Sequence, residues 1–387
     1  MAASPNNIGD SGTRRLSRLT RKQAERYLII QVAAFIAALL VLEYVRQNLV
    51  FKLDQAALGT MTQSKLGDAA AGGRVHCTEL ETRPCLVSWA TAGKPKSIFW
   101  IGNSQLHGIN RMHDADKTAV MAVHDALRPK GLFVTGYSLP NISVPEEAAI
   151  AHLYARAFDP KVIIIPAVFN GMRGGGVRDS VLPLLHGRAA IDQLRGTAVA
   201  EVLRPIARED LKPTGTADQS TASRVEAHLE SGLSTIWPLW HDRNEIRGLI
   251  DYSMYVAEHT IFGVNAQTKR SLISTGYYRQ MKTLEELVVD MRGQGRDVIL
   301  YVPPYRQDIA GPYIPAEYAR FKAALAALAA RHGAHYADLD GLVDGPQWGL
   351  VKDPLFGTLD YDFMHFTAKG HARLASAMQR ELKSIGY

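Results

Sequence analysis

Short apolar stretches alternate with helical patterns along much of the chain. Five stretches have the character of strands, at residues 97–101, 132–134, 162–168, 298–302 and 334–339. Apolar positions recur instead at helical spacing over residues 116–127, 143–158, 278–292 and 315–331. Strands that alternate with helices in this way form a parallel sheet covered by helices on both faces. The pattern predicts an α/β fold, a doubly wound five-stranded parallel sheet, over residues 96–387.

Two local signals support these elements. Residues 162–168 are apolar at every position, as expected for a central parallel strand that is buried on both faces. Ser143, Pro145 and Glu146 combine an N-cap, an early proline and the glutamate of a capping box. A helix is therefore expected to begin at this point.

Residues 172–279 interrupt the alternation, and we interpret them as a mainly helical insertion. The segment opens with a run of glycines and passes through a polar stretch at 212–223 to an aromatic part with Trp237 and Trp240. Tryptophan suits interfaces that are half apolar and half wet, so this part could lie on a membrane surface or contact a partner. The alternative is that both rings fill a core.

An apolar segment at residues 27–45 precedes the α/β pattern. It carries no charge before Glu43, has tyrosines near both ends, and is close to the ~20 residues that a spanning helix needs. The alternatives are a buried core helix or a cleaved signal peptide, but a signal peptide usually has a shorter basic region and a small-residue cleavage site. We predict a transmembrane anchor, with a polar tail at 1–26 before it and an extracytoplasmic stalk at 46–95 after it.

The formal net charge of +6 changes this picture little. Much of the excess lies in the predicted tail, at Arg14, Arg15, Arg18, Arg21, Lys22 and Arg26. Nucleic acid is therefore not an expected partner. Because positive charge favours the cytoplasmic side, residues 46–387 are expected outside the cytoplasm. The predicted location is a bacterial cytoplasmic membrane, crossed once.

The two cysteines, Cys77 and Cys85, stand in the predicted stalk, and no histidine pattern for zinc accompanies them. Outside the cytosol they would form a small disulfide loop, and the alternative is two unrelated thiols. Nothing in the sequence resembles a metal site or a phosphate-cradling loop, so no cofactor is expected.

Candidate chemistry lies at the end of the first predicted strand and near the C-terminus. Ser104 follows an apolar strand and a glycine, a geometry that lifts a hydroxyl above the edge of a sheet. A serine hydroxyl is a weak nucleophile until a base takes its proton. His365, three residues after Asp362 and just before a helix that Thr367 caps, can be that base, with Asp362 to orient it. These three residues are the predicted catalytic triad.

The same motifs resemble those of the SGNH, or GDSL-type, hydrolases and acyltransferases. The G-x-S block of that family matches Gly102–Ser104, and its D-x-x-H block matches Asp362 and His365 with the usual T-x-x-G-H continuation. The resemblance covers roughly residues 96–171 and 280–387. Two positions depart from the family pattern, because Asn103 replaces the common aspartate beside the nucleophile and Gly171 replaces the common aspartate of the third block.

The resemblance also implies an oxyanion hole. Its donors would be the backbone N–H of Ser104, the N–H of a glycine after the second strand and the side-chain amide of an asparagine after the third strand. Gly136 is the best candidate for the glycine by position, and Asn170 stands where the asparagine is expected.

Four residues near these motifs offer alternatives. Ser138 is a competing nucleophile, but Pro140 stands where a G-x-S-x-G elbow needs its last glycine. His107 and His371 are interpreted as structural, because neither has an aspartate three residues before it. Asp360 could take the place of Asp362 as the orienting acid.

An anchored, extracytoplasmic enzyme with an acyl-serine intermediate resembles the family's D-alanyl transfer and polysaccharide O-acetylation proteins. That resemblance implies O-acylation, with acetyl or D-alanyl, of a cell-envelope polysaccharide or polymer, and a multi-span membrane-bound O-acyltransferase as partner. The alternatives are a membrane-tethered esterase or deacetylase of the same fold and a non-catalytic adaptor of an acylation complex.

Overall fold

The computed structural model describes residues 21–45, 68–69, 73–77, 82–108, 116–173, 176–178, 181, 185, 192, 194–209, 267–272, 274–352 and 359–387. The chain divides into two units, one with the N-terminal helix and one with the α/β domain. Most of the predicted tail, much of the predicted stalk, and Trp237 and Trp240 lie outside the described residues.

The α/β domain is built on a six-stranded sheet in which every neighbouring pair is parallel. The strand order is β3-β5-β4-β6-β7-β8. The strands are β3 (His76–Cys77), β4 (Lys96–Gly102), β5 (Leu132–Ser138), β6 (Val162–Pro166), β7 (Asp297–Val302) and β8 (His335–Asp338). All five predicted strands are present. The sheet has six strands rather than five because the two-residue β3 is too short to give a periodic signal.

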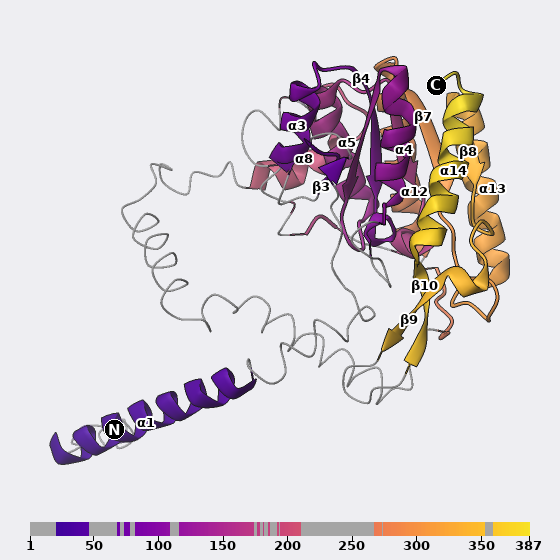
Figure 1. The fold of residues 1–387 in the computed structure, drawn as a ribbon. Helices are drawn as coiled ribbons and strands as arrows, with labels where there is room; N and C mark the ends of the chain where they lie inside the picture. Colours follow the sequence, from indigo (N-terminus) through magenta and orange to yellow (C-terminus); the bar gives the residue numbers. More distant parts are fainter. Residues whose placement is uncertain are drawn as a thin grey trace, which may run out of the picture. The chain divides into compact units, whose positions relative to one another are not determined.

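Helices cover both faces of this sheet, as a doubly wound fold requires (Figure 1). Along β4, Phe99 and Ile101 pack into one core while Ile98 and Trp100 pack into the other, which explains why the strand is apolar at successive positions. The first core includes residues of α5 (Val144–Phe158), α12 (Ser274–Gly293) and α13 (Pro315–His332). The second includes residues of α4 (Ala119–Leu127) and α14 (Ala368–Ser384), which lie side by side.

The helix predicted to begin at the capping box is α5. Ser143 accepts a hydrogen bond from the Glu146 N–H through its hydroxyl, and the Glu146 carboxylate accepts one from the Ser143 N–H. Both bonds satisfy N–H groups that the first turn of a helix cannot pair.

Part of the predicted stalk belongs to the α/β domain. β3 pairs with β5, and α3 (Thr82–Thr91) packs beside it. Cys77 of β3 and Cys85 of α3 are buried in the same core and form a disulfide. The predicted disulfide is therefore confirmed. A small antiparallel pair, β1 (Asp68–Ala69) with β2 (Gly73–Arg74), precedes β3.

The remaining described elements are short or stand outside the sheet. β9 (Trp348–Lys352) and β10 (Leu359–Phe366) pair antiparallel as a separate ribbon. The other elements are α8 (Ala200–Glu209), η2 (Ser104–Leu106), η3 (Arg128–Lys130), η4 (Phe169–Arg173) and η5 (Gly345–Gln347). α8 is a described helix within the predicted insertion.

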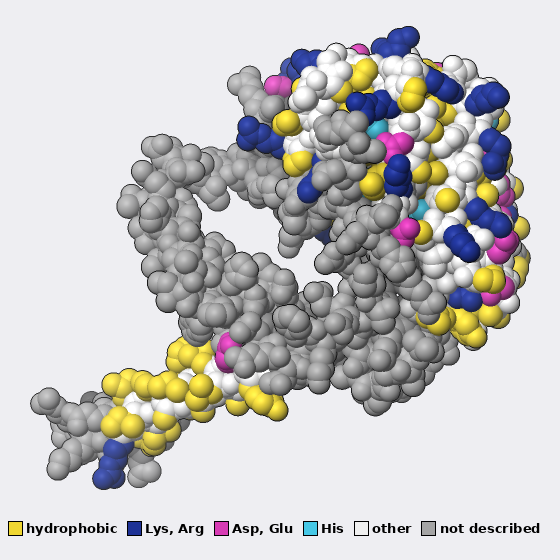
Figure 2. Space-filling model, viewed as in Figure 1, with side chains coloured by type: hydrophobic (Ala, Val, Ile, Leu, Met, Phe, Trp, Pro, Cys, Tyr) yellow, Lys and Arg dark blue, Asp and Glu magenta, His cyan; other side chains and the backbone are white. Residues whose placement is uncertain are grey.

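The N-terminal helix, α1, runs over Arg21–Val45. Apolar side chains line it and are exposed, as Figure 2 shows in yellow; Phe35, for example, is 62% exposed. In the parts of the chain that the structure describes, no helix combines the length and apolar character that crossing a membrane requires. The predicted transmembrane anchor is therefore not shown.

Candidate active site

Ser104 lies at the carboxyl end of β4, as the first residue of the 3-10 turn η2. The turn is tight, because a Cβ at Gly102 would overlap the Leu106 side chain. The Asn103 side chain accepts a hydrogen bond of 2.9 Å from the Gln105 N–H and so caps the turn. Asn103 therefore makes a bond that an aspartate could also make, and its departure from the family pattern leaves the turn intact. Because Ser104 is the first residue of the turn, its N–H has no partner within the turn.

His365 and Asp362 lie on β10, where the register of the β9–β10 ribbon is interrupted. Tyr361 stands opposite Leu350 and Phe366 opposite Trp348, so four residues of β10 bulge out against one of β9. Asp362 folds this bulge, since its Oδ1 accepts hydrogen bonds of 2.9 Å from the N–H groups of both Met364 and His365. A bulge of this kind re-aims side chains, and here it directs Asp362 and His365 to the same point.

The structure brings the three predicted catalytic residues together. His365 Nε2 lies 2.8 Å from Ser104 Oγ, although the two residues are 261 positions apart in sequence. His365 Nδ1 lies 2.9 Å from Asp362 Oδ2. A carboxylate can only accept, so Nδ1 donates to Asp362 and Nε2 is left to accept the serine proton.

The surroundings of Asp362 stabilise the ionised form of its carboxyl group. Its side chain is 4% exposed, and burial alone would raise its pKa. At the low pH where Asp362 titrates, the charge of protonated His365, its hydrogen bond and the two backbone N–H groups outweigh burial and hold the Asp362 pKa below its ordinary value. The carboxyl is therefore ionised at neutral pH, as an orienting acid must be.

Gln105 joins the serine turn to the histidine segment. Its side chain is 1% exposed, and its Nε2 donates to the Pro304 carbonyl at 2.7 Å and to the Met364 carbonyl at 2.9 Å. Met364 directly precedes His365, so this amide fixes the distance between nucleophile and base. No sequence signal indicates this role, because a single glutamine forms no pattern.

A cavity of about 500 Å³ opens beside the serine and histidine. Its walls come from the loop after β5, from η4, from the segments around residues 270 and 312, and from β10. The lining residues are Asn103, Ser104, Asn141, Ile142, Ser143, Glu146, Val168, Asn170, Gly171, Gly176, Arg178, Arg270, Pro312, Tyr313, Tyr361, Asp362, Phe363, Met364 and His365. The volume lies within the range typical of small-molecule sites.

The prediction that the Gly136 N–H donates to the oxyanion is wrong. This residue lies within β5, where its N–H donates to the Val75 carbonyl at 2.8 Å, and it does not line the cavity. Its lack of a side chain serves packing instead, since a Cβ there would overlap Val120. At the carboxyl end of the strand it is Asn141, held at a left-handed φ of 51°, that reaches the cavity.

Asn170 stands where it was predicted to stand. It lies in η4, directly after β6, and lines the cavity together with Ser104. Its Oδ1 is buried without a hydrogen-bond partner in the described residues. An amide oxygen with unused accepting capacity, in the cavity that Ser104 also lines, is suited to accept a hydrogen bond from a ligand, and the Nδ2 group of the same amide is a donor.

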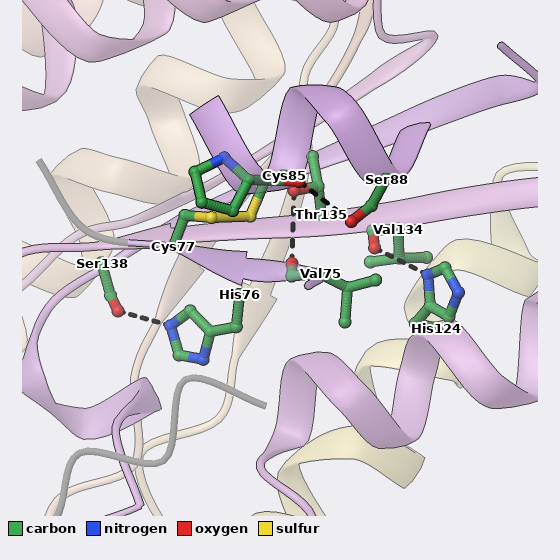
Figure 3. The surroundings of a disulfide bond; sticks show 10 residues. Val75, His76, Cys77, Cys85, Ser88, His124, Val134, Thr135 and Ser138 are labelled. Carbon is green, nitrogen blue, oxygen red and sulfur yellow. Dashed lines mark hydrogen bonds between the residues drawn. A yellow bond between two sulfur atoms is a disulfide. The ribbon is translucent and has the colours of Figure 1, made fainter. Parts of the chain in front are cut away.

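The alternative candidates from the sequence do not take the place of the predicted triad. Ser138 is fully buried at the end of β5 and contacts His76 Nε2 at 2.5 Å (Figure 3). His371 is also fully buried and contacts the Ala119 N–H and the His107 carbonyl. Neither residue lines the cavity. The acid in contact with His365 is Asp362, while Asp360 pairs with Val351 in the ribbon.

Comparison with known proteins adds little. No protein-family model matches the sequence, and no curated protein sequence matches it. The structure is similar to Axe2, an acetylxylan esterase from Geobacillus stearothermophilus, with a TM-score of 0.36 and 13% identity over 76% of this chain and 94% of that chain. It is also similar to a candidate acylhydrolase from Bacteroides fragilis, with a TM-score of 0.35 and 12% identity over 75% of this chain and 88% of that chain. At these values, function has to be argued from the site itself.

Proposed function

We propose that this protein is a serine enzyme of acyl transfer, acting through an acyl-Ser104 intermediate. The observation that carries the proposal is the pair of contacts made by His365, at 2.8 Å to the Ser104 hydroxyl and 2.9 Å to the buried Asp362 carboxylate. That arrangement is the one in which a serine becomes a nucleophile at neutral pH.

The reaction follows from these contacts. Ser104 Oγ attacks the carbonyl carbon of an ester while its proton passes to His365 Nε2, and a tetrahedral oxyanion forms. His365 then gives that proton to the departing alkoxide as the ester C–O bond breaks, which leaves acyl-Ser104. Water or an acceptor hydroxyl attacks the acyl carbon, passes its proton to His365, and the histidine returns a proton to Ser104 Oγ as the acyl group leaves.

The oxyanion needs donors, and two positions offer them. The N–H of Ser104 makes no hydrogen bond within η2, and the Asn170 amide lines the same cavity. One oxyanion donor is typically worth ~3 kcal/mol of transition-state stabilisation. The candidate for a third donor is the N–H of Asn141, because those of Gly136, Ile142 and Ser143 already donate within the fold.

Whether water or a hydroxyl receives the acyl group divides an esterase from an acyltransferase. We favour transfer to a hydroxyl of a cell-envelope polysaccharide or polymer, with acetyl or D-alanyl as the acyl group. The resemblance to SGNH-type acylation proteins supports this choice. The exposed apolar side chains of α1 support contact with a membrane, and the basic residues before this helix favour placing the α/β domain outside the cytoplasm, where a multi-span O-acyltransferase would supply the acyl group.

The test uses the full-length protein in detergent with a chromogenic acetyl ester, comparing the wild type with Ser104→Ala. We expect Ser104-dependent release of the chromophore and a mass increase of one acyl group on the peptide that contains Ser104. Addition of candidate glycan acceptors separates transferase from esterase, because only a transferase yields an acylated glycan. Equal activity and no adduct in both proteins would leave the adaptor as the remaining alternative.

A further inference from the structure

The charged residues that line the cavity are almost all paired with one another. Arg178 meets Glu146 through two hydrogen bonds, Nε to Oε1 at 2.8 Å and NH2 to Oε2 at 2.9 Å. Asp362 is paired with His365. Arg270 is the exception, since no described residue offers its guanidinium a carboxylate or any other hydrogen-bond acceptor. The cavity wall therefore carries one positive charge that the described part of the chain does not neutralise.

The backbone around Arg270 is held firmly in place. Its N–H donates to the Pro312 carbonyl at 2.8 Å, and it forms a parallel bridge with Tyr313. The flanking residues are fixed as well. The Lys269 ammonium donates to the Gly311 carbonyl at 2.5 Å, and the Leu272 N–H donates to the Glu317 carboxylate at 2.8 Å. The described part of the chain thus fixes the backbone of this arginine and its neighbours at the cavity, and none of the described residues holds its guanidinium.

We infer that Arg270 binds an anionic group, a carboxylate or a phosphate, on the substrate whose acyl group Ser104 handles. A guanidinium presents paired N–H donors that match the oxygens of either group, and a partly enclosed site strengthens that contact relative to water. This inference rests on the proposed acyl transfer and names its substrate class, an ester or acceptor that carries negative charge near the reacting oxygen.

The size of the cavity fits such a substrate. A sphere of its volume is about 10 Å across, so a group on Arg270 and an ester at Ser104 can belong to a single sugar or polyol unit. The uronic acid of a glycan and a polyol phosphate would both satisfy this geometry. They share an oxyanion beside esterified hydroxyls, and direct comparison distinguishes them.

The experiment uses two matched pairs of acetyl esters with the full-length protein. In each pair one ester is anionic and the other neutral: acetylated methyl glucuronide against acetylated methyl glucoside, and acetylated glycerol phosphate against acetylated glycerol. The variants are Arg270→Gln and Arg270→Lys. The control is Arg195→Gln, which removes an equal charge from an exposed residue that pairs with Asp192 and does not line the cavity.

We expect the wild type to prefer the anionic member of one pair, and the pair that shows the preference identifies the anion. Arg270→Gln should reduce kcat/KM for that anionic ester by about 10- to 100-fold and leave the neutral ester unchanged, as expected when a charge-assisted hydrogen bond is lost. Arg270→Lys should keep part of the preference, Arg195→Gln all of it, and high salt should weaken it.

An equal loss for anionic and neutral esters in Arg270→Gln would instead indicate a structural role and overturn the inference. So would an anionic-to-neutral ratio that matches the wild type. If the wild type turns over none of the four esters in a Ser104-dependent way, the proposed function fails separately. Calorimetric titration of methyl glucuronide and glycerol phosphate into wild type and Arg270→Gln then decides the anion site alone, and equal or absent binding in both proteins overturns it.

Discussion

His365 and His371 stand six positions apart in the sequence but lie in opposite environments. The His365 side chain is 13% exposed, lines the cavity, and lies between a carboxylate and a hydroxyl. His371 is fully buried; its ring packs against Phe366, and its two nitrogens meet backbone groups, the Ala119 N–H and the His107 carbonyl. The comparison teaches that a histidine becomes a base through its partners and its access to substrate, and not through its place near a motif.

The buried histidines are held neutral. Burial, which outweighs the hydrogen bond to the His107 carbonyl, lowers the pKa of His371 to about 3, and burial lowers the pKa of His107 to about 4. The charge on His365 lowers both values further. A neutral imidazole can donate through one nitrogen and accept through the other, so His371 links the start of α4 to the segment after Ser104. In the proposed reaction His365 takes the serine proton, whereas His371 holds neighbouring segments in place.

The two histidines should respond very differently when each is replaced by asparagine. His365→Asn should lower kcat/KM by roughly 10⁴- to 10⁶-fold, because no base remains for Ser104. His371→Asn should retain most of the activity and instead lower the free energy of unfolding by about 1–3 kcal/mol, the cost of a poorly satisfied buried polar group. Steady-state kinetics and urea denaturation of both variants measure the contrast. If folded His371→Asn were as inactive as His365→Asn, the two environments would not differ as argued.

Removal of the Asp362 carboxylate, which contacts His365 but not His371, should reduce activity less than removal of His365. Asp362→Asn should reduce kcat by about 10³- to 10⁴-fold, since an amide no longer fixes the imidazole in the tautomer that accepts from serine. The measurement is kcat with a chromogenic ester. Asp360→Asn serves as the control, because Asp360 lies two residues earlier on the same strand. A similar loss in both variants would show that the charge of the segment matters more than the contact with His365.

The pH dependence of the free energy of unfolding tests whether the buried histidines are held neutral. A histidine whose pKa is lowered by folding binds a proton more readily in the unfolded chain, so unfolding becomes easier as the pH falls through 6.5 toward the folded value of about 3 or 4. At pH 5 each such histidine should reduce the free energy of unfolding by about 2 kcal/mol relative to pH 7.5. Urea denaturation at both pH values measures this loss.

Asp362 affects stability in a lower pH range than the buried histidines, and the two ranges should not overlap. The Asp362 pKa is held low, so its contribution is present above pH 4 and is lost only as the pH falls through its folded value. His371→Asn should therefore reduce, but not abolish, the loss of stability between pH 7.5 and 5, because His107 still contributes. A profile in that range identical to the wild type would show that His371 does not carry the effect.

The sequence was informative where a local pattern and the chemistry coincide. The five long strands follow from apolar runs, and Ser104, Asp362, His365 and Asn170 stand at the ends of such runs or in a terminal motif. The error at Gly136 has a physical cause. The turn that ends β5 lies at Asn141, several residues later, so a glycine chosen by position falls inside the hydrogen-bonded ladder.

Other features could not be read from the sequence because they depend on partners that are distant along the chain. β3 is defined only by its pairing with β5. The charge of Arg270, which no described residue neutralises, can be recognised only when the cavity walls are assembled around it. Gln105 is a similar case, since its two carbonyl partners lie 199 and 259 positions away.

The smallest expected effect concerns the link between the serine turn and the histidine segment. Gln105→Leu keeps much of the volume of the side chain but removes both donated bonds, so the Met364 carbonyl beside His365 is no longer held. We expect kcat to fall by about 10-fold with KM nearly unchanged, because a small displacement of base from nucleophile affects the transition state more than substrate binding. Steady-state kinetics separates the two parameters.

Gln280→Leu is the matched control for this last change. Gln280 is equally buried, at 1% exposed, but lies on α12 and does not line the cavity. Its replacement should affect stability and leave kcat near the wild-type value. If both variants lost stability alone, Gln105 would belong with the buried histidines as support for the fold. If only Gln105→Leu lost kcat, the serine turn and the bulge of β10 would be shown to act as one unit, with a buried amide setting the distance across which the proton moves.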